Sequence, residues 1–258
     1  MAVMTMAAIA AGPVNAVADT TPARIETTQT PDAYVNYLTS VISRNAAAGK
    51  DTADDRRTLE QYKSLTRTDQ DKYLDYLNDP KLWQNFFDSQ EEVDSPKAMT
   101  SAPADGATAP EGTETVTKYN KDVSFISDST VEREGSTAQK VAQVASDASW
   151  TDKATYTRKV KAFGITVTKL TVWVRYQATR SGARVLKALN SGSSKQNYNL
   201  GVLLSAENAK PWVGGNRAHA ETVWEGRITM SIGTVQIDKV QHLSAAWDGT
   251  WKGTFKTG

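Results

Sequence analysis

The chain of 258 residues contains no cysteine. This absence excludes disulfide bridges, thiolate zinc sites, iron–sulfur clusters, a cysteine nucleophile and a lipid-modified N-terminal cysteine. Histidine is scarce as well: His219 and His242 leave little material for a histidine metal centre or for more than one acid–base pair. The sequence therefore predicts neither a metal site nor a cofactor.

Catalytic motifs are also absent from the sequence. There is no G-x-S-x-G, H-E-x-x-H, P-loop or dinucleotide-binding fingerprint, and the acids around Asp54 lack EF-hand spacing. His219 and Glu221 lie two residues apart in an alternating stretch, so a hydrolase with this acid–base pair is the weakest functional hypothesis. The favoured interpretation makes His219 a surface or cross-strand residue and leaves His242, near a turn, solvated. We expect a protein that is not an enzyme.

Long apolar runs are missing too, since no segment approaches the ~20 apolar residues that a membrane-spanning helix needs. The segment Met1–Ala11 is an uncharged apolar run, and Ala16–Ala18 supplies small residues before Asp19. Both features are typical of a signal peptide, although the basic segment that usually precedes the run is missing. We expect a signal peptide over 1–18 and a secreted, extracellular protein. An ordinary apolar tail or helix is the alternative.

Residues 19–92 carry a helical pattern. Thr30 can cap a helix that Pro31 opens, and apolar residues then recur at helical spacing. Three further short helices are expected to begin near Thr52, at Thr68 as cap, and at Pro80. Together these helices predict a small bundle.

Residues 93–118 are rich in Pro, Ala, Gly, Ser, Thr and acids, which predicts a disordered linker. From 119 to 258 the pattern changes to alternation with period two, clearest at Leu170–Ala178. The predicted fold class is α+β, in which the small helical bundle and the linker precede an antiparallel β-sandwich. Asp248-Gly249 predicts a hairpin turn, Ser191–Ser194 and Gly214–Asn216 predict breaks, and 138–149 is ambiguous. The strand candidates are 123–127, 154–162, 170–178, 185–189, 200–205, 218–224, 228–232, 234–240, 243–247 and 250–255.

Charge divides along the same boundary. Residues 19–118 carry 11 basic and 18 acidic side chains, whereas 119–258 carry 19 basic and 11 acidic ones. The stretch 153–206 alone holds ten Lys or Arg and no acid. Such a surface attracts polyanions. Nucleic acid is a weak candidate for this polyanion, because no helix-turn-helix, RNP-like or zinc-finger pattern occurs and export is expected.

Strand alternation predicts which cations stand together. If the even positions of Leu170–Ala178 are buried, Lys169, Trp173 and Arg175 share the opposite face, and Lys159 and Lys161 share one face of the preceding strand. Cations around a tryptophan can bind an anionic polymer or a sugar ring. Two alternatives remain open: a solvated face with Trp173 packed under a loop, or a dock for the acidic helices of the same chain.

Trp212 is the second candidate for ligand binding. It lies in Lys-Pro-Trp-Val-Gly-Gly, which predicts a loop, and loop aromatics on a rigid β scaffold are a common binding arrangement. We therefore expect Trp212 to be exposed.

The stretch Leu65–Pro80, LTRTDQDKYLDYLNDP, between a signal peptide and a Trp-rich β domain, resembles uncharacterised secreted proteins of actinobacteria. This resemblance implies export without implying an activity. The chain lacks the Gly/His/Tyr pattern of lactococcin-972-like bacteriocins. The first functional hypothesis is a secreted binding protein for an anionic cell-envelope polymer, a glycan or a protein partner. The alternative is a bacteriocin-like toxin or effector acting at a target membrane.

Overall fold

The chain is of the α+β class, as predicted. The computed structural model describes residues 30–89, 91–94, 113–134, 149–230 and 233–258, so the expected signal peptide and nearly all of 138–149 lie outside them. Within these ranges the helices are α1 (Pro31–Ala47), α2 (Ala53–Ser64), α3 (Arg67–Leu77) and α4 (Pro80–Asp88). The strands are β1 (Glu91–Asp94), β2 (Thr113–Lys118), β3 (Val123–Arg133), β4 (Ser149–Ala162), β5 (Ile165–Thr179), β6 (Arg184–Asn197), β7 (Val202–Asn208), β8 (Trp212–Gly214), β9 (Arg217–Met230), β10 (Gly233–Ala246) and β11 (Trp251–Thr257).

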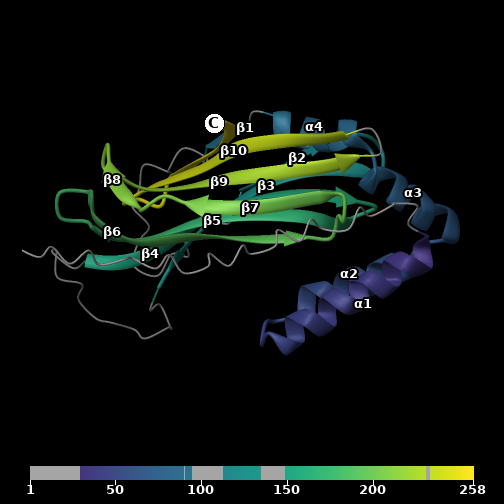
Figure 1. Cartoon of the computed structure of the whole chain (residues 1–258). Helices are drawn as coiled ribbons and strands as arrows, with labels where there is room; N and C mark the ends of the chain where they lie inside the picture. Colours follow the sequence, from purple (N-terminus) through teal and green to yellow (C-terminus); the bar gives the residue numbers. More distant parts are fainter. Residues whose placement is uncertain (1–29, 90, 95–112, 135–148, 231–232) are drawn as a thin grey trace, which may run out of the picture.

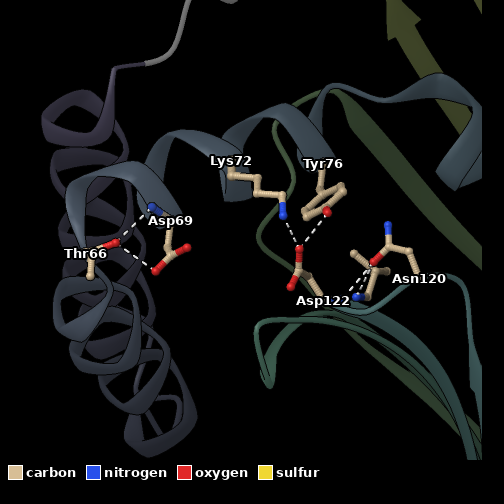
Figure 2. A network of polar contacts seen from close by, with 7 residues as sticks. Thr66, Asp69, Lys72, Tyr76, Asn120 and Asp122 are labelled. Atoms are coloured by element: carbon tan, nitrogen blue, oxygen red, sulfur yellow. Dashed lines mark hydrogen bonds and ion pairs between the residues drawn. The ribbon is translucent and has the colours of Figure 1, made fainter.

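Side-chain caps explain where the helices begin. The Thr30 hydroxyl accepts a hydrogen bond from the backbone N–H of Ala33 at 3.3 Å, so α1 begins as predicted. In α3 the cap is Thr66 and the prediction of Thr68 was wrong. The reason is geometric: the Thr66 hydroxyl accepts from the backbone N–H of Asp69 at 3.2 Å, three residues on, as Figure 2 shows.

The strands form two antiparallel sheets. One sheet has the order β2-β3-β4-β5-β6. The other has the order β1-β11-β10-β9-β7, and β8 also pairs with β9. Figure 1 shows the long strands of both sheets running along the same axis of the molecule, with α1 and α2 side by side at one end.

Strands occupy both ends of the segment 93–118, where the sequence predicts a disordered linker. Val93 lies in β1 and is buried, and residues 113–118 form β2. The remaining residues, 95–112, lie outside the described part. Composition misses these strands because both pair at sheet edges through backbone hydrogen bonds, which need no apolar side chains.

Several strands are longer than predicted. β9 is continuous over the expected strand 218–224 and through 228–230 of the next one, and β10 is continuous over 234–240 and most of 243–247. The two strands pair without interruption from Gly233↔Met230 to Ala246↔Arg217, so the polar residues between the expected strands stay in the ladder. The Asp248-Gly249 turn after β10 is confirmed.

The two sheets share a buried interior, which gives a sandwich-like arrangement. Gln241 of β10 is fully buried, and its amide donates to the backbone carbonyls of Tyr156 at 3.1 Å and Leu170 at 3.4 Å in the other sheet. The Gln241 carbonyl accepts from the indole of Trp224 at 2.7 Å. One buried polar side chain therefore links both sheets with its hydrogen bonds satisfied.

The helices and the sheets contribute side chains to the same buried apolar cluster, a contact that the sequence left open. Phe86 of α4 packs against Phe125 and Phe255, with ring centroids 5.5 and 5.9 Å apart. The buried guanidinium of Arg158 lies 5.3 Å from the Phe86 ring and donates to the Ser89 hydroxyl at 2.8 Å. This contact fixes the end of α4 between the sheets.

Tyrosines dock the other helices. The Tyr34 hydroxyl donates to the backbone carbonyl of Tyr198 at 3.1 Å, and the Tyr198 hydroxyl donates to Asp55 of α2 at 2.6 Å. Burial raises the pKa of both tyrosines, so their hydroxyls remain protonated donors. The helical unit is thus held against the start of the β6–β7 connection by buried hydrogen bonds.

A charged contact joins α3 to the other corner of the five-stranded sheet. Lys72 forms an ion pair with Asp122, and the Tyr76 hydroxyl donates to the same carboxylate at 2.9 Å (Figure 2). Asn120 holds the loop by accepting from the backbone N–H groups of Asp122 at 2.9 Å and Val123 at 2.8 Å. The hydrogen bond from Lys72 lowers the pKa of Asp122.

Candidate functional site

Five of the six predicted binding residues lie on one face of the five-stranded sheet. The register pairs Lys159 with Lys169, and side chains paired across an antiparallel ladder point to the same side. Trp173 and Arg175 follow on that side of β5, and Lys161 follows on that side of β4. All five are half-buried. The even-numbered residues of β5 from Leu170 to Tyr176 point to the opposite side and are buried in the interior. We call the set Lys153, Lys159, Lys161, Lys169, Trp173 and Arg175 the basic face.

The tryptophan of the basic face lies over a glycine. A Cβ built on Gly192 of β6 would come within 2.8 Å of Cζ2 of Trp173, so the ring occupies the place of a side chain there. Lys153, paired with Arg175 in the register, has its Nζ 5.4 Å from the Trp173 ring centroid. Trp173 therefore lies against the sheet, between a cation and a strand backbone.

Sequence reasoning missed Lys153 and Gly192 as parts of this surface. Ser191–Ser194 was expected to break the chain, but it lies inside β6. The sequence signal for an unbroken strand here is Gly192, which pairs with Trp173 on the neighbouring strand. Only a residue without a Cβ leaves room for the indole ring at this position. Small hydroxyl side chains occupy other positions on this side of the sheet, namely Thr130, Thr155, Thr157, Thr171 and Ser194. Of these, Thr157 and Thr171 are buried and form a hydrogen bond with each other at 3.1 Å.

Two cations of the basic face are held by acids. Lys159 forms an ion pair with Asp128, and Arg175 binds Glu134 through both carboxylate oxygens, with Nε–Oε1 at 2.7 Å. The Arg175 hydrogen bond lowers the pKa of Glu134, so the carboxylate remains charged. Lys161 has no acidic partner in the described part of the chain, and the same holds for Lys169. Positive charge is therefore left over on this face.

A cleft of about 650 Å³ continues the basic face toward the helices. Lys169 and Gln196 line it from the sheet, and Arg44 and Lys50 line it from the α1–α2 hairpin. The three acids that line it already have partners. The buried Asp55 accepts from Tyr198 at 2.6 Å, Asp54 pairs with Arg57 at 3.2 Å in α2, and Asp51 accepts from the backbone N–H of Ala53 at 2.9 Å. The acidic helices thus approach the basic face at one of its ends.

Trp212 does not join the basic face. It lies in β8, paired with β9 of the other sheet, and its side chain is 40% exposed, as expected, although in a short strand and not in a loop. Its ring stacks on His219, with centroids 4.9 Å apart and planes at 5°. The two tryptophans proposed for binding, Trp173 and Trp212, therefore lie on the surfaces of different sheets.

The two histidines contact each other. Nδ1 of His219 lies 3.0 Å from Nε2 of His242, and Nε2 of His219 lies 2.9 Å from the carbonyl oxygen of Gly214. The carbonyl can only accept, so Nε2 of His219 carries its proton and a neutral His219 accepts from His242 through Nδ1. The favoured cross-strand role of His219 is supported, and both its nitrogens are engaged without Glu221.

His242 is not the solvated residue that the sequence suggests. Burial lowers its pKa to about 4, and His219 and the cations Lys256, Arg217 and Lys252 act in the same direction. His242 is therefore neutral at physiological pH, and it stabilises the β8–β9 hairpin through His219.

No group of three or more His, Asp or Glu side chains that could hold a metal ion occurs among the described residues. In the same part of the chain, none of the helices has the length and apolar character needed to cross a membrane. Comparison of the chain with protein-family models, with curated proteins and with solved structures finds no match.

Proposed function

We propose that this chain is an exported, non-catalytic binding protein with a β-sandwich scaffold, which holds an anionic glycan polymer of a cell envelope on its basic face. The observation that carries the proposal is that five cations share one face of the sheet with Trp173. Trp173 offers an indole ring for a sugar ring, and the cations offer charge for phosphate or carboxylate groups.

The hydroxyl side chains support a glycan in particular. Thr130, Thr155 and Ser194 are at least partly exposed on the side of the sheet that carries the cations, and such hydroxyls both donate and accept hydrogen bonds. Binding of this kind combines several weak contacts over a long surface, so we expect it to weaken with salt. A protein partner with an acidic surface is the alternative occupant.

A second candidate function is a toxin-like protein that acts at a target membrane. Trp212 and Val213 favour it, because both side chains are about 40% exposed on a short strand. Release of a dye trapped in anionic vesicles separates the two functions. A binding protein leaves the vesicles intact, whereas a toxin releases the dye.

The test of the first proposal is co-sedimentation with purified bacterial cell walls, before and after chemical removal of their anionic polymers. We expect binding at low salt that is lost from about 0.05 to about 0.5 M salt, and no binding to the stripped walls. The double variant Lys161→Glu/Lys169→Glu should weaken binding at least about tenfold, because among the described residues these cations have no acidic partner whose release would disturb the fold.

Arg227→Glu/Lys256→Glu provides the matched control, because it changes the net charge by the same amount at two exposed cations on the outer side of the other sheet. It should sediment as the unmodified protein does. If the double variant and the control lost equal amounts of cell-wall binding, the effect would depend on net charge alone. That result would contradict a binding site on the basic face. Absence of sedimentation at every salt concentration would contradict the proposal as a whole.

A further inference from the structure

Exposed apolar side chains gather at one place in this molecule. Among the described residues, the large apolar side chains that are well exposed are Val116, Leu186, Leu189, Leu203, Trp212 and Val213, at 39 to 51%. Four of them belong to two neighbouring segments, β6 and β8. We call Leu186, Leu189, Trp212 and Val213 the apolar seam. As consecutive residues, Trp212 and Val213 point to opposite sides of β8, so the seam includes both sides of this short strand.

Irregularities in β6 expose the two leucines. The register with β5 passes from Val185 directly to Lys187 and from Ala188 directly to Asn190, so Leu186 and Leu189 have no partner in the ladder. A bulged residue is released from the regular alternation of the strand and can project away from the interior. Each of the two bulges therefore presents a leucine to solvent.

Hydrogen bonds hold β8 alongside this part of β6. Asn216, just after β8, accepts from the backbone N–H of Val185 at 2.9 Å, and its amide donates to Ala183 at 2.8 Å. Before β8, the carbonyl of Ala209 accepts from the Ser191 hydroxyl at 3.4 Å. The strand containing Trp212 and Val213 is thus fixed at both ends beside the bulged part of β6.

The turn and the histidines make the β8 side rigid. Gly215 and Asn216 both have positive φ, 55° and 61°, as a two-residue type I′ hairpin requires. Trp212 then stacks on His219, which is itself held by Gly214 and His242. The exposed indole has little conformational entropy left to lose on binding.

The two segments that contribute the apolar seam carry charges of one sign. The contributing segments, 180–191 and 209–217, contain five cations and no acid. Arg180, Arg184, Lys187 and Lys210 are exposed. Exposed apolar side chains surrounded by cations match the two layers of an anionic lipid surface, whose negative headgroups overlie an apolar interior.

We propose that the apolar seam docks the protein on the surface of an anionic lipid bilayer. The leucines, Val213 and Trp212 enter the interfacial layer, where an indole is favoured, while Lys187 and Lys210 contact lipid phosphates. β6 and β8 meet at the end of the sheets opposite to α1 and α2 (Figure 1), so the helices do not obstruct a planar surface there. This docking is independent of polymer binding by the basic face.

Co-sedimentation of the full chain with vesicles tests the docking. We expect binding to phosphatidylglycerol vesicles and much weaker binding to phosphatidylcholine vesicles. The double variant Leu186→Ser/Leu189→Ser should weaken binding at least about tenfold, because burial of one leucine alone corresponds to about that factor. Val213→Glu should act in the same direction through a different strand, and Lys187→Glu/Lys210→Glu should remove the preference for anionic lipid.

Val116→Glu is the matched control, since Val116 is 51% exposed on β2, the other edge strand of the same sheet. It should bind vesicles as the unmodified protein does. Circular dichroism and the melting temperature verify that each variant is folded. Unchanged binding in folded seam variants, an equal loss with Val116→Glu, or no binding to anionic vesicles would overturn the proposal and leave a protein partner for the seam.

Discussion

The outer faces of the two sheets are built on the same alternation, yet they differ in charge. The strands of the five-stranded sheet direct eight cations and three acids outward, whereas those of the six-stranded sheet direct four cations and six acids outward. The five-stranded set is Lys118, Lys153, Lys159, Lys161, Lys169, Arg175, Arg184 and Lys187 with Glu114, Asp128 and Glu132. The six-stranded set is Arg217, Arg227, Lys252 and Lys256 with Glu92, Asp94, Glu207, Glu221, Glu225 and Asp238.

The two outer faces also differ in whether their charged side chains have polar partners. On the six-stranded sheet Lys252 contacts both Glu92 and Asp94, and the Glu225 carboxylate accepts from Ser205 at 3.1 Å. On the five-stranded sheet Lys161 and Lys169 have no such partner among the described residues. This favours the five-stranded face as the one that binds an anion.

A glycine beneath an aromatic ring occurs on both sheets, but on opposite sides. Gly253 of β11 lies in the interior, where an added Cβ would come within 2.8 Å of the Tyr156 ring. Gly192 of β6 lies on the outer face, where the same Cβ would come within 2.8 Å of the Trp173 ring. The Tyr156 ring is fully buried, whereas the Trp173 ring is partly exposed.

The largest expected effect on stability follows from this contrast. Gly253→Ala should lower the free energy of unfolding by about 2–3 kcal/mol, because an overpacked interior must shift. Gly192→Ala should cost about 1 kcal/mol or less, since alanine also restricts the unfolded chain. Urea unfolding of both variants measures the difference. Equal losses would show that Trp173 is as tightly confined as Tyr156 and is poorly placed to meet a ligand.

The second prediction compares the two tryptophans. Trp173→Ala should weaken cell-wall binding by about tenfold, because the platform for the sugar ring is lost, and should leave vesicle binding unchanged. Trp212→Ala should do the reverse. The two co-sedimentation assays measure both variants. If one substitution reduced both kinds of binding, the basic face and the apolar seam would not be independent surfaces.

The third prediction concerns pH and the six-stranded sheet. The pKa of His242 is about 4 in the folded protein, below the ordinary value of 6.5, so the folded state binds fewer protons than the unfolded state between these values. Stability from this residue is complete above pH 6.5 and falls as the pH decreases toward 4. Because His242 keeps partial exposure, we expect a decrease in melting temperature of only about 3 °C over this window.

His242→Gln is the control for the pH effect, since glutamine keeps a donor and an acceptor but does not titrate. The variant should lose less stability than the unmodified protein between pH 6.5 and 4. Parallel curves for the two proteins would place the titrating group elsewhere.

Local signals predicted the helices and the co-facial cations. Thr30 before Pro31 is a complete capping signal in two residues, and strand alternation sufficed to bring Lys169, Trp173 and Arg175 to one face. Both signals depend on residues close in sequence, so no knowledge of the tertiary structure was needed.

The features that sequence could not predict depend on distant pairing. β1 and β2 are strands because β11 and β3 supply backbone partners for them, and Ser191–Ser194 stays extended because Gly192 accommodates Trp173. Likewise, the position of His242 beside His219 depends on the β9–β10 register. The burial and the pKa of a residue depend on such contacts, which cannot be predicted from the composition of the chain.

The smallest expected effect concerns the corner where α3 meets the five-stranded sheet. Asp122→Asn removes the charge that pairs with Lys72 but leaves an oxygen that can accept from Tyr76. Since the pKa of Asp122 is lowered in the folded protein, its contribution is present above the ordinary aspartate value and is lost as the pH falls through the folded value. The window therefore lies below that of His242. Thermal unfolding should show a slight, salt-sensitive decrease for Asp122→Asn at neutral pH, smaller than that for Gly253→Ala. A large loss would mean that the helices depend on this ion pair more than on the buried hydrogen bonds of Tyr34 and Tyr198.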